Sequence, residues 1–130
     1  MEHEEYMRQA LELARLAMAE GEVPVGCVIV RDGAVVGRGR NRRETAQTAL
    51  GHAELEAIAQ ACRTLGGWRL AGCALYVTLE PCPMCAGAIV NARIPAVYYG
   101  AKDDKAGCCG SVPVGARMRG CHSCFKDRCF

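Results

Sequence analysis

Short β-branched segments alternate with helical apolar patterns along this chain, and that alternation restricts the possible folds more than any other feature. Apolar side chains recur at steps of three and four through residues 4–20, which predicts an amphipathic helix. Residues 23–30 and 34–39 predict two strands, and Asp32-Gly33 between them is a hairpin signal. The first part of the chain is therefore expected to be a helix followed by a β-hairpin.

The same alternation continues through the middle of the chain. Helical spacing returns over residues 52–65, a short apolar segment at 74–79 predicts a buried strand, and residues 83–92 predict another helix. Pro95 prevents that helix from continuing, and residues 97–99 are a further strand candidate. Helices that alternate with strands in this way pack on the faces of a mixed sheet, so an α/β fold is expected.

Composition narrows the class of protein. The chain has 130 residues, enough for one domain, and its 51% apolar content with only 5% aromatic residues predicts an aliphatic core. No segment approaches the roughly 20 apolar residues of a membrane span, and the acidic N-terminal helix is unlike a secretory signal, so a cytoplasmic protein is expected. The net charge of +2 is mildly basic and does not by itself indicate a nucleic-acid partner.

Ten cysteines are many for a chain with no export signal, and disulfides are not expected in that setting. Cys82 and Cys85 stand in the segment Pro-Cys-Pro-Met-Cys at the predicted start of a helix, where Pro83 fits the first turn. Helical residues three positions apart project the same way, and the positive potential of a helix N-terminus favours thiolates. These two cysteines are therefore candidate metal ligands.

His52-Ala53-Glu54 opens the preceding predicted helix. Two thiolates and one imidazole suit Zn²⁺ and leave a fourth position for water. Zinc lowers the pKa of bound water from about 15.7 towards about 7, and Glu54 could take that proton and return it to a leaving group. The expected reaction is attack on a carbon that bears an amine, with loss of ammonia. A purely structural metal site is the alternative.

Several stretches of the chain resemble one enzyme family. They are residues 22–26 (EVPVG), 39–42 (GRNR), 51–54 (GHAE), 78–89 (TLEPCPMCAGAI), 91–95 (NARIP), 99–103 (YGAKD) and 110–112 (GSV). Together they resemble the TadA-type tRNA-specific adenosine deaminases of the cytidine deaminase-like superfamily, whose zinc chemistry carries the H-x-E and P-C-x-x-C signature. The resemblance covers residues 4–112.

This resemblance implies a cytidine deaminase-like three-layer α/β/α fold with a central mixed sheet. It implies that His52, Cys82 and Cys85 bind one Zn²⁺ per subunit and that Glu54 is the proton shuttle. The implied reaction is hydrolytic conversion of adenosine to inosine at the wobble position of a tRNA anticodon, in a homodimer.

The resemblance also implies substrate contacts. Asn41 would hydrogen-bond the target nucleoside, and Ala53 and Asp103 would lie beside the bound nucleic acid. Arg38, Arg40 and Arg42 could share one face of a strand as phosphate contacts, with a solvated edge strand as the alternative. An anticodon loop suits such a site because its bases can be splayed out.

Residues 113–130 do not resemble the corresponding region of the family. We therefore expect a zinc-dependent deaminase domain over 1–112 and an atypical Cys/Arg-rich, disordered tail over 113–130, so that the sheet lacks its usual last strand and C-terminal helix. A second zinc site formed by Cys121, His122, Cys124 and Cys129 is an alternative for the tail. Two other functions stay open, namely a deaminase of a free guanine- or cytosine-type base or nucleoside, and a catalytically impaired paralogue.

Overall fold

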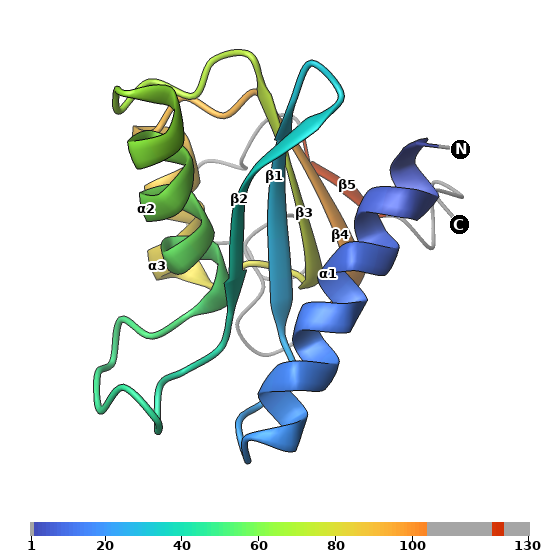
Figure 1. Cartoon of the computed structure of the whole chain (residues 1–130), viewed down its shortest axis with the longest axis vertical. Coiled ribbons are helices and arrows are strands. Elements are labelled where there is room, and N and C mark those ends of the chain that lie inside the picture. Colours follow the sequence, from blue (N-terminus) through green and yellow to red (C-terminus); the bar gives the residue numbers. More distant parts are fainter. Residues whose placement is uncertain (1, 104–120, 124–130) are drawn as a thin grey trace.

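A mixed sheet with the strand order β2-β1-β3-β4-β5 organises the chain (Figure 1). The structure is a computed structural model that describes residues 2–103 and 121–123. Its elements are α1 (Glu2–Ala19), β1 (Gly26–Arg31), β2 (Ala34–Arg40), α2 (Ala53–Leu65), β3 (Cys73–Leu79), α3 (Pro83–Asn91), β4 (Ala96–Ala101) and β5 (Cys121–Ser123). Strand β1 pairs antiparallel with β2 and β3, whereas β4 pairs parallel with β3 and β5.

The helices cover both faces of the sheet, which confirms the three-layer α/β/α architecture. Helix α1 lies across one face, and α2 and α3 lie on the other (Figure 1). Alternation along the strands divides the core between the faces: Ile29 and Leu75 point to α2 and α3, whereas Val28 and Tyr76 point to α1. None of the helices within residues 2–103 is long and apolar enough to cross a membrane.

The core is mainly aliphatic, as the composition predicts, but the α1 face departs from that expectation. Tyr76 and Tyr98 stack there with ring centroids 4.8 Å apart, and Tyr6 packs against Tyr76 at 5.3 Å. The hydroxyl of Tyr76 lies 2.5 Å from Nδ1 of His3. Three of the four tyrosines therefore cluster against α1, and the hydroxyl of the buried Tyr76 has a polar partner.

Helix α2 lies unusually close to β2. A Cβ atom at Gly39 would stand 2.1 Å from the carbonyl oxygen of Ala53, and one at Gly37 would stand 2.3 Å from that of Ala57. The alanines that face these glycines have no exposed surface. Because neither side of the contact carries a large side chain, backbone meets backbone, and this fixes the position of the α2 N-terminus relative to the sheet.

The start of one strand and the presence of another differ from the sequence expectation. Strand β1 begins at Gly26 and not at residue 23, because Pro24 has no N–H for a ladder and residues 22–25 leave the sheet. The sheet was expected to lack its last strand, but the three-residue β5 pairs with β4 at that edge. The rest of the proposed tail, including the remaining thiols of the alternative second zinc site, lies outside the described residues.

We predict that Gly39→Ala destabilises the protein by about 1–3 kcal/mol, because the new methyl group must push α2 away from β2. Urea unfolding followed by circular dichroism measures this loss. Gly67→Ala is the matched control, because a Cβ atom there meets nothing within 4 Å. That variant should stay within about 0.5 kcal/mol of the parent. Equal stability of the two variants would contradict the close contact.

Candidate active site

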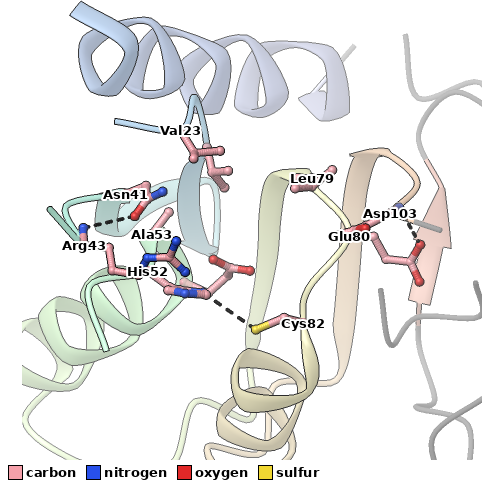
Figure 2. Close-up of a pocket in the computed structure, with 11 residues that line it drawn as sticks. Val23, Asn41, Arg43, His52, Ala53, Leu79, Glu80, Cys82 and Asp103 are labelled. Carbon is pink, nitrogen blue, oxygen red and sulfur yellow. Dashed lines mark hydrogen bonds between the residues drawn. The ribbon is translucent and has the colours of Figure 1, made fainter. Parts of the chain in front are cut away.

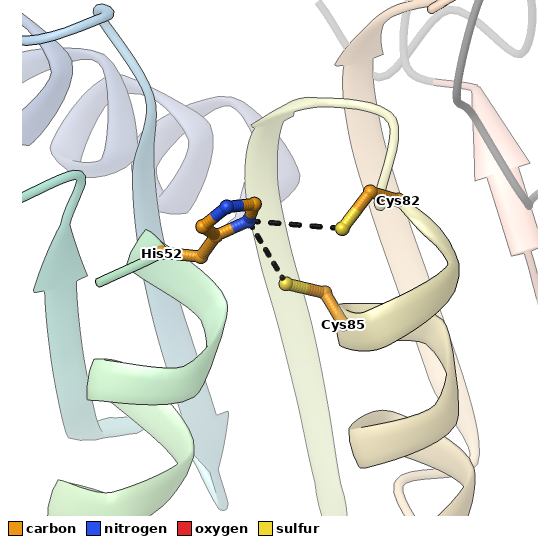
Figure 3. Close-up of side chains that lie close together, drawn as sticks. All are labelled: His52, Cys82 and Cys85. Atoms are coloured by element: carbon orange, nitrogen blue, oxygen red, sulfur yellow. Dashed lines mark hydrogen bonds between the residues drawn. The ribbon is translucent and has the colours of Figure 1, made fainter. Parts of the chain in front are cut away.

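Three potential metal ligands meet where α2 and α3 begin. His52 is the N-cap residue of α2, Cys82 is the N-cap residue of α3, and Cys85 lies in the first turn of α3. Nδ1 of His52 is 3.7 Å from Sγ of Cys82 and 3.5 Å from Sγ of Cys85 (Figure 3). All three donor atoms lie within 4.8 Å of one another, so one metal ion could contact them all.

The local structure explains this convergence. Only residues 80–82 connect β3 to α3, and Pro83 starts the helix at its first position. The two cysteines are therefore held at the carboxyl end of β3. The contact of α2 with Gly39 brings His52 to the same edge of the sheet from residues far away in sequence.

The two cysteines differ in protonation. Hydrogen bonds from the thiol and backbone N–H of Cys85, from the N–H of Met84, and the nearby His52 lower the pKa of Cys82 to about 5. The pKa of Cys85 is raised instead, because its thiol donates to Cys82 and is largely buried. The pair thus holds one thiolate at neutral pH, and binding a cation would favour loss of the second proton.

Glu54 is the buried carboxyl group beside this cluster. Only 4% of the residue is exposed, and burial raises its pKa to about 7. A carboxyl group with such a pKa can exchange protons with a bound substrate near neutral pH. The carboxyl group of Glu54 and the three potential metal ligands therefore lie together.

These groups form part of the wall of a cavity of about 310 Å³. Its lining comprises Val23, Val25, Asn41, Arg43, His52, Ala53, Glu54, Leu79, Glu80, Cys82 and Asp103. Figure 2 shows Asn41 and Arg43 on one side and Glu80 and Asp103 on the other, with His52 and Cys82 between them. The cavity therefore brings together six of the seven site residues expected from the sequence, and the seventh, Cys85, is not part of the lining but lies beside His52.

Asn41 is nearly buried and sits at the end of β2. Its backbone N–H donates to the carbonyl of Val25 at 3.0 Å, and its Oδ1 accepts from the N–H of Arg43 at 3.2 Å. On the opposite side of the cavity, the N–H of Asp103 donates to Oε1 of Glu80 at 3.2 Å. Two of the three expected substrate-contact residues, Asn41 and Asp103, are thus held by hydrogen bonds that involve backbone N–H groups.

The arginines near Asn41 are arranged differently from the expected row of phosphate contacts. Arg40 donates to both carboxylate oxygens of Glu20, at 2.7 and 3.0 Å. Nε of Arg42 lies 3.1 Å from a carboxylate oxygen of Glu56. Arg43 is the arginine that lines the cavity. The expectation of one shared arginine face was incomplete because these ion pairs join residues that are distant in sequence.

Two buried carboxyl groups were missed by the sequence analysis. Glu22 is 5% exposed and Glu80 is 2% exposed; Glu80 lines the cavity, and Glu22 directly precedes the lining residue Val23. Each accepts a backbone N–H from a loop at the cavity rim, Glu22 from Thr45 at 2.6 Å and Glu80 from Asp103 at 3.2 Å. The sequence signal for each was an acidic residue directly beside an apolar strand segment. The same pattern occurs at exposed strand ends, so it does not by itself predict a buried carboxyl group.

The fold and this grouping of side chains are those of the nucleobase deaminase class, in which a His/Cys/Cys group and a separate glutamate lie at the starts of two neighbouring helices. Comparison with known proteins agrees with that class, since residues 1–119 match the MafB19-like deaminase family. A tRNA-specific adenosine deaminase from Agrobacterium fabrum is 49% identical over 117 residues, which cover 90% of this chain and 75% of the relative. The chain therefore belongs to the MafB19-like deaminase family and groups with its tRNA-specific adenosine deaminases.

Other relatives give the same picture. A tRNA-specific adenosine deaminase from Bacillus subtilis is 51% identical over 82% of this chain. A solved structure from a study of A-to-I editing by tRNA:A34 deaminases has a TM-score of 0.86 at 43% identity and covers 95% of this chain and 99% of that one. A guanine deaminase from B. subtilis has a TM-score of 0.75 at 45% identity and covers 78% and 66% of the two chains.

The chain spans only part of several curated relatives. It covers 66% of the length of the B. subtilis tRNA-specific adenosine deaminase and 64% of that of a Streptococcus pyogenes relative, strain MGAS8232.

We predict that the protein binds one divalent metal ion and that His52→Ala and Cys85→Ser each abolish stoichiometric binding. Loss of a hydrogen-bonding partner of a ligand weakens metal affinity by about 10–100-fold. Loss of the ligand itself should weaken it more. Elemental analysis after dialysis measures the bound metal. Cys62→Ser is the control, because that thiol lies on α2 outside the group. Retention of metal by His52→Ala would exclude this site.

Proposed function

We propose that this chain catalyses hydrolytic deamination of adenosine to inosine at the wobble position of a tRNA anticodon. The observation that carries the proposal is the burial of Glu54 beside a His/Cys/Cys group in a cavity. The identity of about half of the residues with tRNA-specific adenosine deaminases supports the choice of substrate.

The three donors fit Zn²⁺ well. Bonds of about 2.3 Å to sulfur and about 2.0–2.1 Å to nitrogen at tetrahedral angles place the two donor atoms about 3.6 Å apart. The distances from Nδ1 of His52 are 3.7 and 3.5 Å. Three protein ligands leave a fourth position open, which is typical of catalytic zinc. When bound there, zinc would supply an acidified water molecule at neutral pH.

Glu54 would move the protons of the reaction. It takes a proton from the attacking water as the new C–O bond forms at C6 of adenine. It then gives a proton to the amino nitrogen as the C–N bond breaks, so that ammonia leaves and the base becomes hypoxanthine. A carboxyl pKa of about 7 suits both transfers, because neither protonation state is strongly favoured at neutral pH.

The rest of the cavity would hold the nucleoside. Asn41 offers an amide for hydrogen bonding, Ala53 leaves space beside the reacting base, and Arg43 provides a cation near the entrance. Asp103 borders the opposite side. An extruded base of an anticodon loop could enter such a cavity without melting of a duplex.

A guanine deaminase activity is the second candidate. It is favoured by the structural similarity to the guanine deaminase of B. subtilis at 45% identity. The same metal ligands and glutamate would serve that reaction, so the substrate preference depends on the cavity walls and on contacts outside the cavity.

We further propose that residues 1–112 form the deaminase domain and that the protein acts as a homodimer. Trp68 and Val90 are exposed large apolar side chains, and Arg93 at the end of α3 stacks over the Trp68 ring at 5.6 Å, so these residues lie close to one another. Exposed apolar groups of this kind favour association with a second copy. A tRNA substrate would place the protein in the cytoplasm.

The decisive assay measures inosine in an anticodon stem-loop with adenosine at the wobble position. Zinc-loaded protein should convert it, and Glu54→Gln should lose at least about 100-fold in rate while keeping its metal, because only the proton shuttle is removed. Free adenosine and guanine are assayed in parallel. Turnover of guanine without RNA turnover would select the second candidate, and no turnover of any substrate would indicate an impaired paralogue.

We predict that Arg43→Gln raises the KM for the RNA several-fold. It should also reduce the slope of log KM against log salt concentration by about one. The reason is that Arg43 lines the cavity, where its charge could pair with a phosphate of the bound RNA. Arg8→Gln removes the same charge from an exposed site on α1, where Arg8 pairs with Glu5, and serves as the control. A similar salt dependence in both variants would rule out the phosphate contact.

A further inference from the structure

We propose that Glu22 is a positioning residue that fastens one wall of the cavity. The activity test of this role rests on the proposed function, whereas the hydrogen-exchange test does not. Glu22 precedes Val23-Pro24-Val25, the segment that lies outside the sheet just before β1. Its carboxylate is almost fully buried, yet it lies outside the metal cluster.

The carboxylate of Glu22 holds a loop from the other end of the hairpin. Oε1 accepts the N–H of Glu44 at 3.2 Å, and Oε2 accepts the N–H of Thr45 at 2.6 Å. The hydroxyl of Thr45 also donates to Oε2. Three donors from two consecutive residues thus converge on one buried side chain, which is a much more specific arrangement than a surface contact.

Both segments joined in this way line the cavity. Val23 and Val25 lie on the Glu22 side, and Asn41 and Arg43 lie on the loop side. The N–H of Asn41 donates to the carbonyl of Val25 at 3.0 Å, so this backbone bond and the Glu22 carboxylate join the two segments at neighbouring points. Displacement of residues 44–45 would therefore move Arg43 and release the amide contact that orients Asn41.

The loop of residues 42–51 contains no helix or strand, so its position depends on contacts such as the one with Glu22. Residues 42–51 are closed on themselves by backbone bonds, including that from the N–H of Arg42 to the carbonyl of Gly51 at 2.8 Å. Those bonds set the internal shape of the loop but not its position against residues 22–25. Glu22 supplies that connection from across the cavity wall.

A carboxylate is needed for this anchor and an amide would not suffice. Glu22 forms no ion pair with any residue in the described ranges, so its buried charge is compensated by donors from the loop. Hydrogen bonds from Thr45 lower its pKa, which keeps it ionised. Glutamine has a single acceptor oxygen, and its NH₂ group would face a backbone N–H, so Glu22→Gln loses at least one bond.

The test compares Glu22→Gln and Thr45→Val with Glu12→Gln, an exposed carboxylate on α1 that controls for loss of charge. Hydrogen exchange of the Glu44 and Thr45 amides should accelerate by about tenfold in Glu22→Gln, because their acceptor is lost or weakened. The KM for the RNA should rise about tenfold while kcat changes less than about threefold and metal content stays unchanged. Thr45→Val should likewise raise the KM, and Thr45→Ser, which retains the hydroxyl, should keep the KM of the parent.

The outcomes separate this proposal from the proposed function. If the parent protein deaminates the RNA but Glu22→Gln leaves KM and amide exchange unchanged, Glu22 is not a positioning residue. If the parent has no activity on RNA, amide exchange alone decides, and unchanged exchange in Glu22→Gln overturns the anchor. If Glu22→Gln does not fold, Thr45→Val decides, because Thr45 is exposed and the substitution preserves its shape. Equal KM and exchange in Thr45→Val, Thr45→Ser and the parent would also overturn the anchor.

Discussion

The site depends on the backbone contact between α2 and β2. Gly39 leaves no room for even a methyl group beneath the carbonyl of Ala53, so the first turn of α2 is pressed against the sheet. This places His52 opposite the first turn of α3, which the short connection from β3 has already set at the same edge. Two helix N-termini then face one cavity, and their positive potential favours the thiolate and the anionic groups gathered there.

Buried carboxyl groups shape the cavity in different ways. Glu54 has its pKa raised to about 7 by burial, which fits proton transfer. Glu22 has its pKa lowered by hydrogen bonds from Thr45, which fits a permanent charge that holds a loop. The two glutamates differ in which effect is larger: burial outweighs the hydrogen bonds at Glu54 and favours its neutral form, whereas the hydrogen bonds from Thr45 outweigh burial at Glu22 and favour its anion.

The proposed chemistry and the choice of substrate rest on separate parts of the molecule. The ligand cluster and Glu54 would serve adenosine or guanine equally, which agrees with the similarity to solved structures of both kinds of deaminase. Under the proposed function, selection between them would depend on the cavity wall formed by Asn41 and Arg43 and on the loop that carries Arg43. The proposed anchor at Glu22 would then connect the fold to substrate choice more than to the proton transfers.

The sequence by itself determined the order of elements and the pairing of Cys82 with Cys85 at the start of one helix. These are local properties, because a hairpin signal, a helical period and a Cys-x-x-Cys spacing are each set by residues close together in the chain. Only the tertiary structure decided the late start of β1, the short β5, the pairing of Arg40 with Glu20 and the burial of Glu22. Those features join segments that are distant in sequence, and an ion pair or buried acceptor depends on which segments meet, which no local pattern records.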